Sequence, residues 1–238
     1  MKNEFLNKME KLSNKINEVF NEKQIEKFFN YMNLLLEWNE KINLTAIVEE
    51  DDIILKHFID SITINKYLKN DNKIIDVGTG AGFPGIPISI INEEKQITLL
   101  DSLNKRVIFL QDVIDKINLK NVNAIHSRAE DFGKNKDYRE KYDVAVSRAV
   151  ASLNILLEYM LPLVKVGGKC ICMKGSNIEE ELENSKFAIK ELGGRLIKKE
   201  EFLLPDSDIK RNIIIIEKIK NTPSKYPRKS GTPVKQPL

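Results

Sequence analysis

The chain has 238 residues, of which 42% are hydrophobic and 31% are charged. These values fit one water-soluble domain with a modest elaboration, and they exclude both a wholly disordered chain and a very small scaffold. The 38 lysines and arginines against 35 acidic residues leave a net charge of +3, which is too weak to argue for a nucleic-acid partner by itself.

Neither a membrane segment nor a secretory leader is expected. The first ten residues, MKNEFLNKME, lack the unbroken apolar core of a secretory signal. The longest uncharged stretch, residues 77–92, is broken by four glycines and two prolines, whereas a membrane span needs roughly 20 mostly apolar residues. We therefore expect a cytoplasmic protein that does not associate with membranes.

Residues 1–70 are predicted to form an N-terminal helical extension. Apolar residues recur at helical spacing over residues 6–20 and again over residues 25–36, and a third helix is expected at about residues 52–68. Each helix has one apolar face, so the extension should pack on the rest of the protein.

Residues 71–220 change to short β-rich runs that alternate with amphipathic helical stretches. The predicted strands are residues 73–77, 96–101, 123–127, 142–147, 168–174, 195–204 and 212–219. This alternation predicts an α/β domain with a mainly parallel sheet and helices on both faces. The last two strands are joined by a turn too short for a crossover helix, so we expect seven strands with one reversed near the end.

Residues 221–238 form a basic, proline-rich tail that contains four of the eight prolines and no acidic residue. An extended segment on the surface is expected. The tail accounts for the whole excess charge, because the rest of the chain has 34 basic against 35 acidic residues. It is either a solubilising terminus or an RNA-binding segment with phosphate contacts and one stacking ring, supplied by Lys225, Tyr226, Arg228, Lys229 and Lys235.

The sequence IIDVGTGAGFPG (74–85) joins a predicted strand to a helix. Its glycines allow the backbone to approach a ligand closely, which makes Gly78 and Gly80 candidate cofactor contacts. Gly80, Gly82 and Gly85 also match the G-x-G-x-x-G pattern of dinucleotide sites. That pattern alone does not separate a dinucleotide from S-adenosylmethionine, so the neighbouring charges must decide.

Acidic residues at three successive strand ends favour S-adenosylmethionine. Asp76, two residues before Gly78, would repel a pyrophosphate but attract an ammonium and a sulfonium. Asp101 follows Gly80 by 21 residues, which suits a carboxylate that binds ribose hydroxyls. Glu130 follows the third strand, near the expected adenine. Alternatively, Asp76 braces the loop, Asp101 caps the next helix and Glu130 is a solvated loop acid.

Seven separated motifs occur along the chain: NLTAI (43–47), HFIDS (57–61), DVGTGAGFPGIP (76–87), LLDSLNKRV (99–107), HSRAED (126–131), DVAVSRAVA (143–151) and YPRKSGTPVKQPL (226–238). With these motifs in this order, the chain resembles the bacterial small-subunit rRNA guanine-N7 methyltransferase family, long called glucose-inhibited division protein B. The resemblance covers nearly the whole chain. It is specific because the glycine motif alone would fit many other methyltransferases.

The resemblance implies a class I S-adenosylmethionine-dependent methyltransferase fold with a helical extension. It also implies methyl transfer to N7 of a single guanine in the decoding-region loop of 16S rRNA, in the 30S subunit or its precursor. By motif position, cofactor contacts fall on Gly78, Phe83, Ala129, Glu130 and Arg148. Because the tail is one of the motifs, the resemblance favours RNA binding over a solubilising role.

Guanine N7 carries a lone pair and no hydrogen, so no general base is expected and the enzyme has only to position the reactants. Arg148 ends the fourth strand and is the main positioning candidate, because its fork can hold guanine O6 or a phosphate. The alternative is an ion pair with Asp76 or Glu130. Lys174 is a further RNA contact or a solvated lysine.

Other residues with reactive side chains are expected to be structural. Cys170 and Cys172 lie one residue apart in an apolar run, which predicts two buried thiols on one strand face and no disulfide or metal site. His57 and His126 are expected to be structural. A monomer without a metal is expected, and the competing hypotheses are an NAD-dependent oxidoreductase and a non-catalytic RNA-binding protein.

Overall fold

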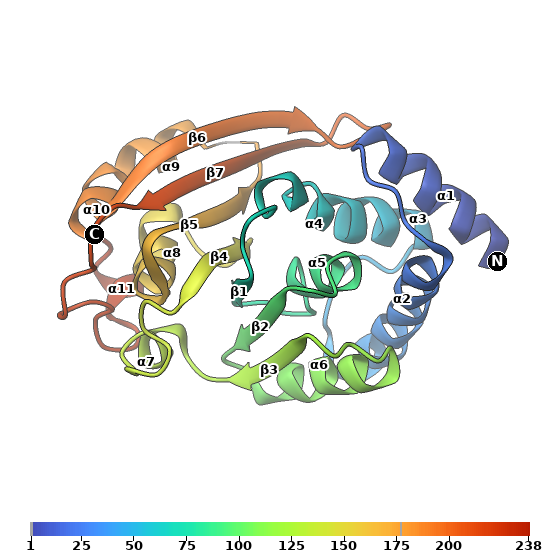
Figure 1. Ribbon diagram of the computed structural model, residues 1–238, viewed down its shortest axis with the longest axis horizontal. Helices are drawn as coiled ribbons and strands as arrows, with labels where there is room; N and C mark the ends of the chain where they lie inside the picture. The colour runs from blue at the N-terminus through green and yellow to red at the C-terminus, as the bar shows by residue number, and fades with distance from the viewer. Residues whose placement is uncertain (1, 177) are drawn as a thin grey trace.

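A seven-stranded sheet in the order β3-β2-β1-β4-β5-β7-β6, with helices on both faces, organises the protein (Figure 1). The computed structural model describes residues 2–176 and 178–238. The strands are β1 (Lys73–Val77), β2 (Gln96–Asp101), β3 (Val122–His126), β4 (Tyr142–Arg148), β5 (Val164–Lys174), β6 (Gly194–Leu203) and β7 (Lys210–Lys218). Strands β1 to β5 pair in parallel, and β7 is antiparallel to β5 and β6. The predicted fold class, with one reversed strand, is confirmed.

The helical extension begins with α1 (Lys2–Lys15) and α2 (Glu22–Ile42). Helix α2 starts at a capping box, in which Asn21 and Gln24 each accept a hydrogen bond from the other's backbone. The predicted third helix is a short series: α3 (Glu50–Asp52), the π-helix η1 (Ile53–Ile59), α4 (Asp60–Ile62) and a 3-10 turn (Asn65–Tyr67). The 3.6-residue apolar spacing did not reveal the π-helix, which is wound by bonds five residues apart.

The other helices are α5 (Gly85–Ile91), α6 (Asn104–Lys116), α7 (Ala129–Phe132), α8 (Leu153–Met160), α9 (Glu179–Asn184), α10 (Lys186–Glu191) and α11 (Thr232–Lys235), with a 3-10 turn at Leu161–Leu163. Helices α9 and α10 follow one another directly and are separated at Ser185.

Alternating strand residues divide the core between the two sheet faces. Ile74 of β1 packs with α5, α6 and the helical extension, and Ile75 packs with α8 and α10 on the other face. Phe28 and Phe58 of the extension are fully buried in the first of these cores. Burial of side chains of this size contributes about 1.5–3 kcal/mol each, so the extension and the sheet stabilise one another.

The tail is folded against the α8 face, which corrects the expectation of an extended surface segment. Tyr226 is 5% exposed and belongs to that core. Arg139 donates hydrogen bonds to the backbone carbonyls of Thr222 (2.8 Å) and Tyr226 (2.7 Å). The composition of the tail resembles that of a linker, but composition does not reveal its contacts with distant residues such as Arg139.

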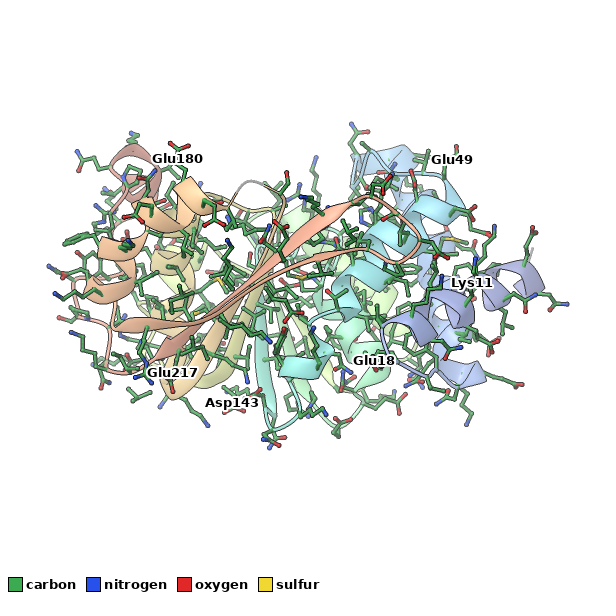
Figure 2. The ribbon with its side chains drawn as sticks, turned by 90° about the horizontal axis from the view of Figure 1, so that it is seen from above. Lys11, Glu18, Glu49, Asp143, Glu180 and Glu217 are labelled. Carbon is green, nitrogen blue, oxygen red and sulfur yellow. The ribbon has the colours of Figure 1, made fainter. Side chains whose placement is uncertain are left out.

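Charged side chains of both signs project from distant parts of the surface, as Lys11, Glu49 and Glu180 show (Figure 2). This mixture fits the near-zero charge of the chain outside the tail. Among residues 2–176 and 178–238, no helix combines the length and the apolar character that crossing a membrane requires.

Candidate functional site

Two adjoining cavities lie at the carboxyl ends of the strands, where the sheet order reverses between β1 and β4. Ligands of open α/β sheets bind at such switch points. The smaller cavity has a volume of about 200 Å³ and the larger one about 650 Å³. They share a boundary made by Gly78, Asp101, Ser102 and Val150. The larger volume lies within the roughly 300–1,000 Å³ of small-molecule sites.

Asp76 braces the glycine loop, as the alternative predicted, and it lines neither cavity. The residue is fully buried, and its Oδ2 accepts hydrogen bonds from Thr79 Oγ1 (2.6 Å) and the Gly85 amide (2.8 Å). Burial raises the pKa of Asp76 to about 7, although both hydrogen bonds act to lower it. One hydroxyl and one backbone amide of its own loop thus bind this buried side chain.

Gly78 and Gly80 are placed as the motif predicts. Gly78 has φ +71° and lines both cavities, and Gly80 lines the larger one. A Cβ atom at Gly78 would lie 2.6 Å from Cγ2 of Val150. Because Gly78 has no side chain, Val150 can pack against its backbone at the boundary of the two cavities.

Asp101 lies in the cavity wall and also contacts the start of the next helix. It is 3% exposed and lines both cavities. Its Oδ2 accepts a hydrogen bond from the Gly80 amide and its Oδ1 from the Leu103 amide, both at 2.9 Å. The carboxylate thus joins the glycine loop to the start of α6 while it forms part of the cavity wall.

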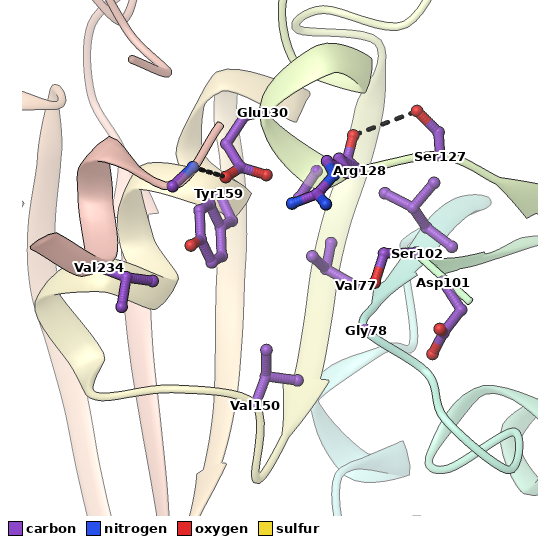
Figure 3. Close-up of a pocket in the computed structure, with 13 residues that line it drawn as sticks. Val77, Gly78, Asp101, Ser102, Ser127, Arg128, Glu130, Val150, Tyr159 and Val234 are labelled. Carbon is purple, nitrogen blue, oxygen red and sulfur yellow. Dashed lines mark hydrogen bonds between the residues drawn. The ribbon is translucent and has the colours of Figure 1, made fainter. Parts of the chain in front are cut away.

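The smaller cavity contains Ala129 and Glu130 on one side and the tail on another (Figure 3). Glu130 is 6% exposed, and its Oε1 accepts a hydrogen bond from the Gly231 amide at 3.1 Å. It is therefore not a solvated loop acid. Tyr159 lies in the same wall, and its pKa is raised to about 12, mainly by burial and to a smaller extent by the nearby Glu130. Sequence reasoning did not assign Gly231 or Val234 to this site.

Arg148 lines the larger cavity and is held by the helical extension. Its Nη1 donates to the Lys56 carbonyl (3.1 Å) and to Asp60 Oδ2 (3.2 Å), and its guanidinium lies 5.0 Å from the ring centroid of Phe83. Burial lowers the pKa of Arg148, against the effect of Asp60. Arg148 does form an ion pair, as the alternative predicted, but its partner is Asp60 and not Asp76 or Glu130.

His57 is a cavity residue that sequence reasoning treated as structural. Its ring stacks on Phe83, with centroids 4.4 Å apart, and its Nε2 lies 2.9 Å from Thr45 Oγ1. Burial and then Arg148 lower the pKa of His57 to about 3, so the imidazole is neutral near pH 7. The HFIDS motif was the available signal. His126 lines neither cavity, and its Nε2 lies 3.1 Å from the Ser102 carbonyl oxygen.

The larger cavity has a cationic lining, formed by Lys56, Arg106, Arg148, Lys174 and Arg211. Lys174 is placed here, but its ammonium donates to the Ala151 carbonyl and to Glu181 Oε1, both at 2.6 Å. Arg211 Nε donates to the same Asp60 Oδ2 as Arg148, at 3.0 Å. One buried carboxylate therefore orients two of the five cations.

The tail residues predicted to bind RNA divide into two groups. Lys225 pairs with Glu191 at 2.8 Å, and Arg228 forms a fork with the buried carboxylate of Glu158. Tyr226 has its ring in the core, so it is not available to stack on a base, which corrects that prediction. The remaining cations of the tail are exposed: Lys229 and Lys235.

Cys170 and Cys172 are buried free thiols, as predicted, and burial raises the pKa of Cys172 to about 12. Within the described part of the chain, no group of three or more histidine, cysteine or acidic side chains is arranged to hold a metal ion.

Comparison with known proteins places the chain in a family. The family model described as rRNA small subunit methyltransferase G matches residues 24–209. A protein of that name from Acetivibrio thermocellus is 59% identical over 91% of this chain and 90% of its own length. One from Alkaliphilus metalliredigens is 54% identical over 90% and 91%.

Solved structures resemble the fold at lower identity. A SAM-dependent methyltransferase from Aquifex aeolicus has a TM-score of 0.53 at 18% identity, over 69% of this chain and 92% of that one. TYW2 from M. jannaschii, solved in complex with AdoMet, has a TM-score of 0.52 at 19% identity, over 67% and 77%. The sequence matches are the stronger finding, and by them the chain belongs to the rRNA small subunit methyltransferase G family.

Proposed function

We propose that this protein transfers a methyl group from S-adenosylmethionine to N7 of a single guanine in the decoding-region loop of 16S rRNA. The family match over residues 24–209 carries the proposal. The two adjoining cavities support it, because a transfer reaction needs one space for a donor and a connected space for an acceptor. The partner would be the 30S subunit or its precursor, met by a monomer in the cytoplasm.

The residues of the smaller cavity and its boundary suit the donor. Glu130 and Asp101 supply carboxylate oxygens for amine and hydroxyl groups, and Gly78 and Ala129 leave space beside them. Phe83 and Arg148 would face the donor from the larger cavity. S-adenosylmethionine supplies an electrophilic methyl group on a sulfonium.

The larger cavity suits a nucleic-acid acceptor because five cations line it against two carboxylates, Asp60 and Asp101, and this excess attracts phosphate. Guanine N7 can attack through its lone pair without losing a proton, so the chain needs no general base there. The neutral imidazole of His57 is consistent with a positioning role. Arg148, fixed by Asp60 and the Lys56 carbonyl, would orient the acceptor with N–H groups that these partners leave open.

The arrangement of the glycine loop argues against an NAD-dependent oxidoreductase. A pyrophosphate would require free backbone amides at the start of α5. The Gly85 amide already donates to Asp76 and the Gly80 amide to Asp101. These internal hydrogen bonds remove two of the donors that a dinucleotide would use.

A single-turnover assay with methyl-labelled S-adenosylmethionine tests the proposal on naked 16S rRNA, on 30S subunits and on subunits from cells that lack the enzyme. Label on N7 of one guanine in 16S rRNA is the expected result. Label on another atom or another RNA would refute the proposed target. RNA binding without any transfer would support the non-catalytic alternative, and calorimetry with NAD tests the oxidoreductase.

A further inference from the structure

The end of the tail forms part of the smaller cavity, across from the glycine loop. Gly231 and Val234 line it together with Gly78, Leu100 and other residues of the strand ends. Figure 3 shows Val234 beside Tyr159, and the Gly231 amide directed at Glu130. The wall is therefore built from segments more than a hundred residues apart in sequence, of which the tail is the last.

Two strong attachments hold this wall in place. Arg228 donates from Nε and Nη2 to both oxygens of Glu158, whose side chain is fully buried, and its backbone amide donates to the same carboxylate at 2.8 Å. At the far end, Asn154 Nδ2 donates to the Leu238 carbonyl at 3.0 Å. The two partners, Glu158 and Asn154, both lie on α8. The segment between the attachments thus lies along one side of the cavity as a strap fixed at two points.

The strap also orients a residue of the cavity. The Gly231 amide donates to Oε1 of Glu130 at 3.1 Å, and Arg128 Nη1 donates to Ser230 Oγ at 2.9 Å. Gly231 has φ +80°, a conformation that turns the chain toward the cavity. The position of the Glu130 carboxylate therefore depends on the tail.

We propose that residues 229–238 are a wall of the donor site, which binds the adenosine part of the methyl donor and positions Glu130 for it. Ligand pockets combine an apolar lining with a few fixed polar groups that orient the ligand. Val234 supplies apolar surface here, and Glu130 supplies a fixed carboxylate. The proposal rests on the proposed function, since it needs an S-adenosyl ligand. It gives the tail a role in donor binding that is separate from any phosphate contact of Lys229 and Lys235.

The test measures the affinity of S-adenosylhomocysteine by calorimetry for four proteins: the full chain, a deletion of residues 229–238, Val234→Ala and the matched control Val19→Ala, whose side chain is 83% exposed and lies outside both cavities. The deletion keeps the Arg228 attachment, and circular dichroism verifies its fold. We expect it to lose about tenfold or more in affinity, because a hydrogen bond to a carboxylate and an apolar wall are removed. Val234→Ala should also weaken binding, whereas Val19→Ala, the same change at an exposed valine outside both cavities, should not.

A second measurement separates a wall of the site from a merely structural tail. Lys229 and Lys235 are exposed, so trypsin can cleave after them, and saturating S-adenosylhomocysteine should slow both cleavages. In steady state, Val234→Ala should raise KM for the donor and leave KM for rRNA unchanged. Equal affinity in the full and shortened chains, or cleavage that the ligand does not slow, would overturn the role of the tail alone. A full chain that does not bind S-adenosylhomocysteine would overturn the proposed function as well.

Discussion

Replacing Arg148 with alanine should weaken both the fold and methyl transfer. The guanidinium donates to Asp60 and to the Lys56 carbonyl, and it lies over the ring of Phe83. Hydrogen bonds to charged groups contribute about 1.5–3 kcal/mol, and a cation over an aromatic ring about 0.5–2 kcal/mol. Asp60 keeps Arg211 as a partner, so we expect the free energy of unfolding to fall by about 2–3 kcal/mol rather than by the full sum.

Urea unfolding followed by the fluorescence of the single tryptophan measures this change. Trp38 packs edge-on against Phe109 and donates a hydrogen bond to Asp112, so its emission reports on the helical extension. Arg195→Ala is the matched control, because the Arg195 side chain is 63% exposed and pairs with Glu217 at the surface. That change should cost less than about 1 kcal/mol.

A double-mutant cycle with Asp60→Asn isolates the ion pair from the other contacts of Arg148. Asp60 is 1% exposed, and its Oδ1 has no hydrogen-bond partner in the described part of the chain. Loss of Arg148 leaves this carboxylate undercompensated, so Asp60→Asn should cost about 1–3 kcal/mol less in the Arg148→Ala background than in the wild type. Additive costs, or an Arg148→Ala protein as stable as the wild type, would refute the assigned ion pair.

Three further changes have defined outcomes. Arg228→Ala leaves Glu158 buried without its partner and should cost about 3–5 kcal/mol; an unchanged melting temperature would contradict this. Gly85→Ala would press a Cβ into Leu99, so the free energy of unfolding in urea should fall by about 1–3 kcal/mol. The affinity for the methyl donor, measured by calorimetry, should fall as well. A stable variant with normal affinity would show that the loop tolerates a side chain. The pKa of His57 is lowered to about 3, so between that pH and its ordinary pKa the unfolded chain binds a proton that the folded chain does not. The free energy of unfolding should therefore rise with pH in this range by up to about 1.4 kcal/mol per pH unit. In His57→Gln this rise should flatten, and an unchanged slope in urea unfolding at a series of pH values would contradict the lowered pKa of His57.

The strands and the edge that carries the site were predictable because their signals are local. Alternation of β-rich and helical runs determines a parallel sheet, and the short final turn requires a reversed strand. Gly78 and Asp101 follow strands directly, so the fold brings them to the same cavity boundary without further information.

The remaining features depend on contacts between distant residues. Arg148 and Asp60 are 88 residues apart, and nothing in the sequence ranks Asp60 above the nearer acids as its partner. Arg228 and Glu158 are 70 residues apart, so composition describes a mobile tail where the fold has a buried ion pair. The burial of Asp76 was not apparent either, because its partners are one backbone amide and one hydroxyl of the loop.

The order in which the chain is synthesised has a consequence for when the site can exist. The larger cavity draws residues from Leu44 to Arg211, and the smaller one reaches Val234. Within the part of the chain that the structure describes, strand β6 pairs only with β7, which lies between it and β5. A growing chain therefore carries an unpaired β6 until β7 has emerged, and it lacks a complete cavity until the tail follows. Both cavities are accordingly complete only after the tail has been synthesised.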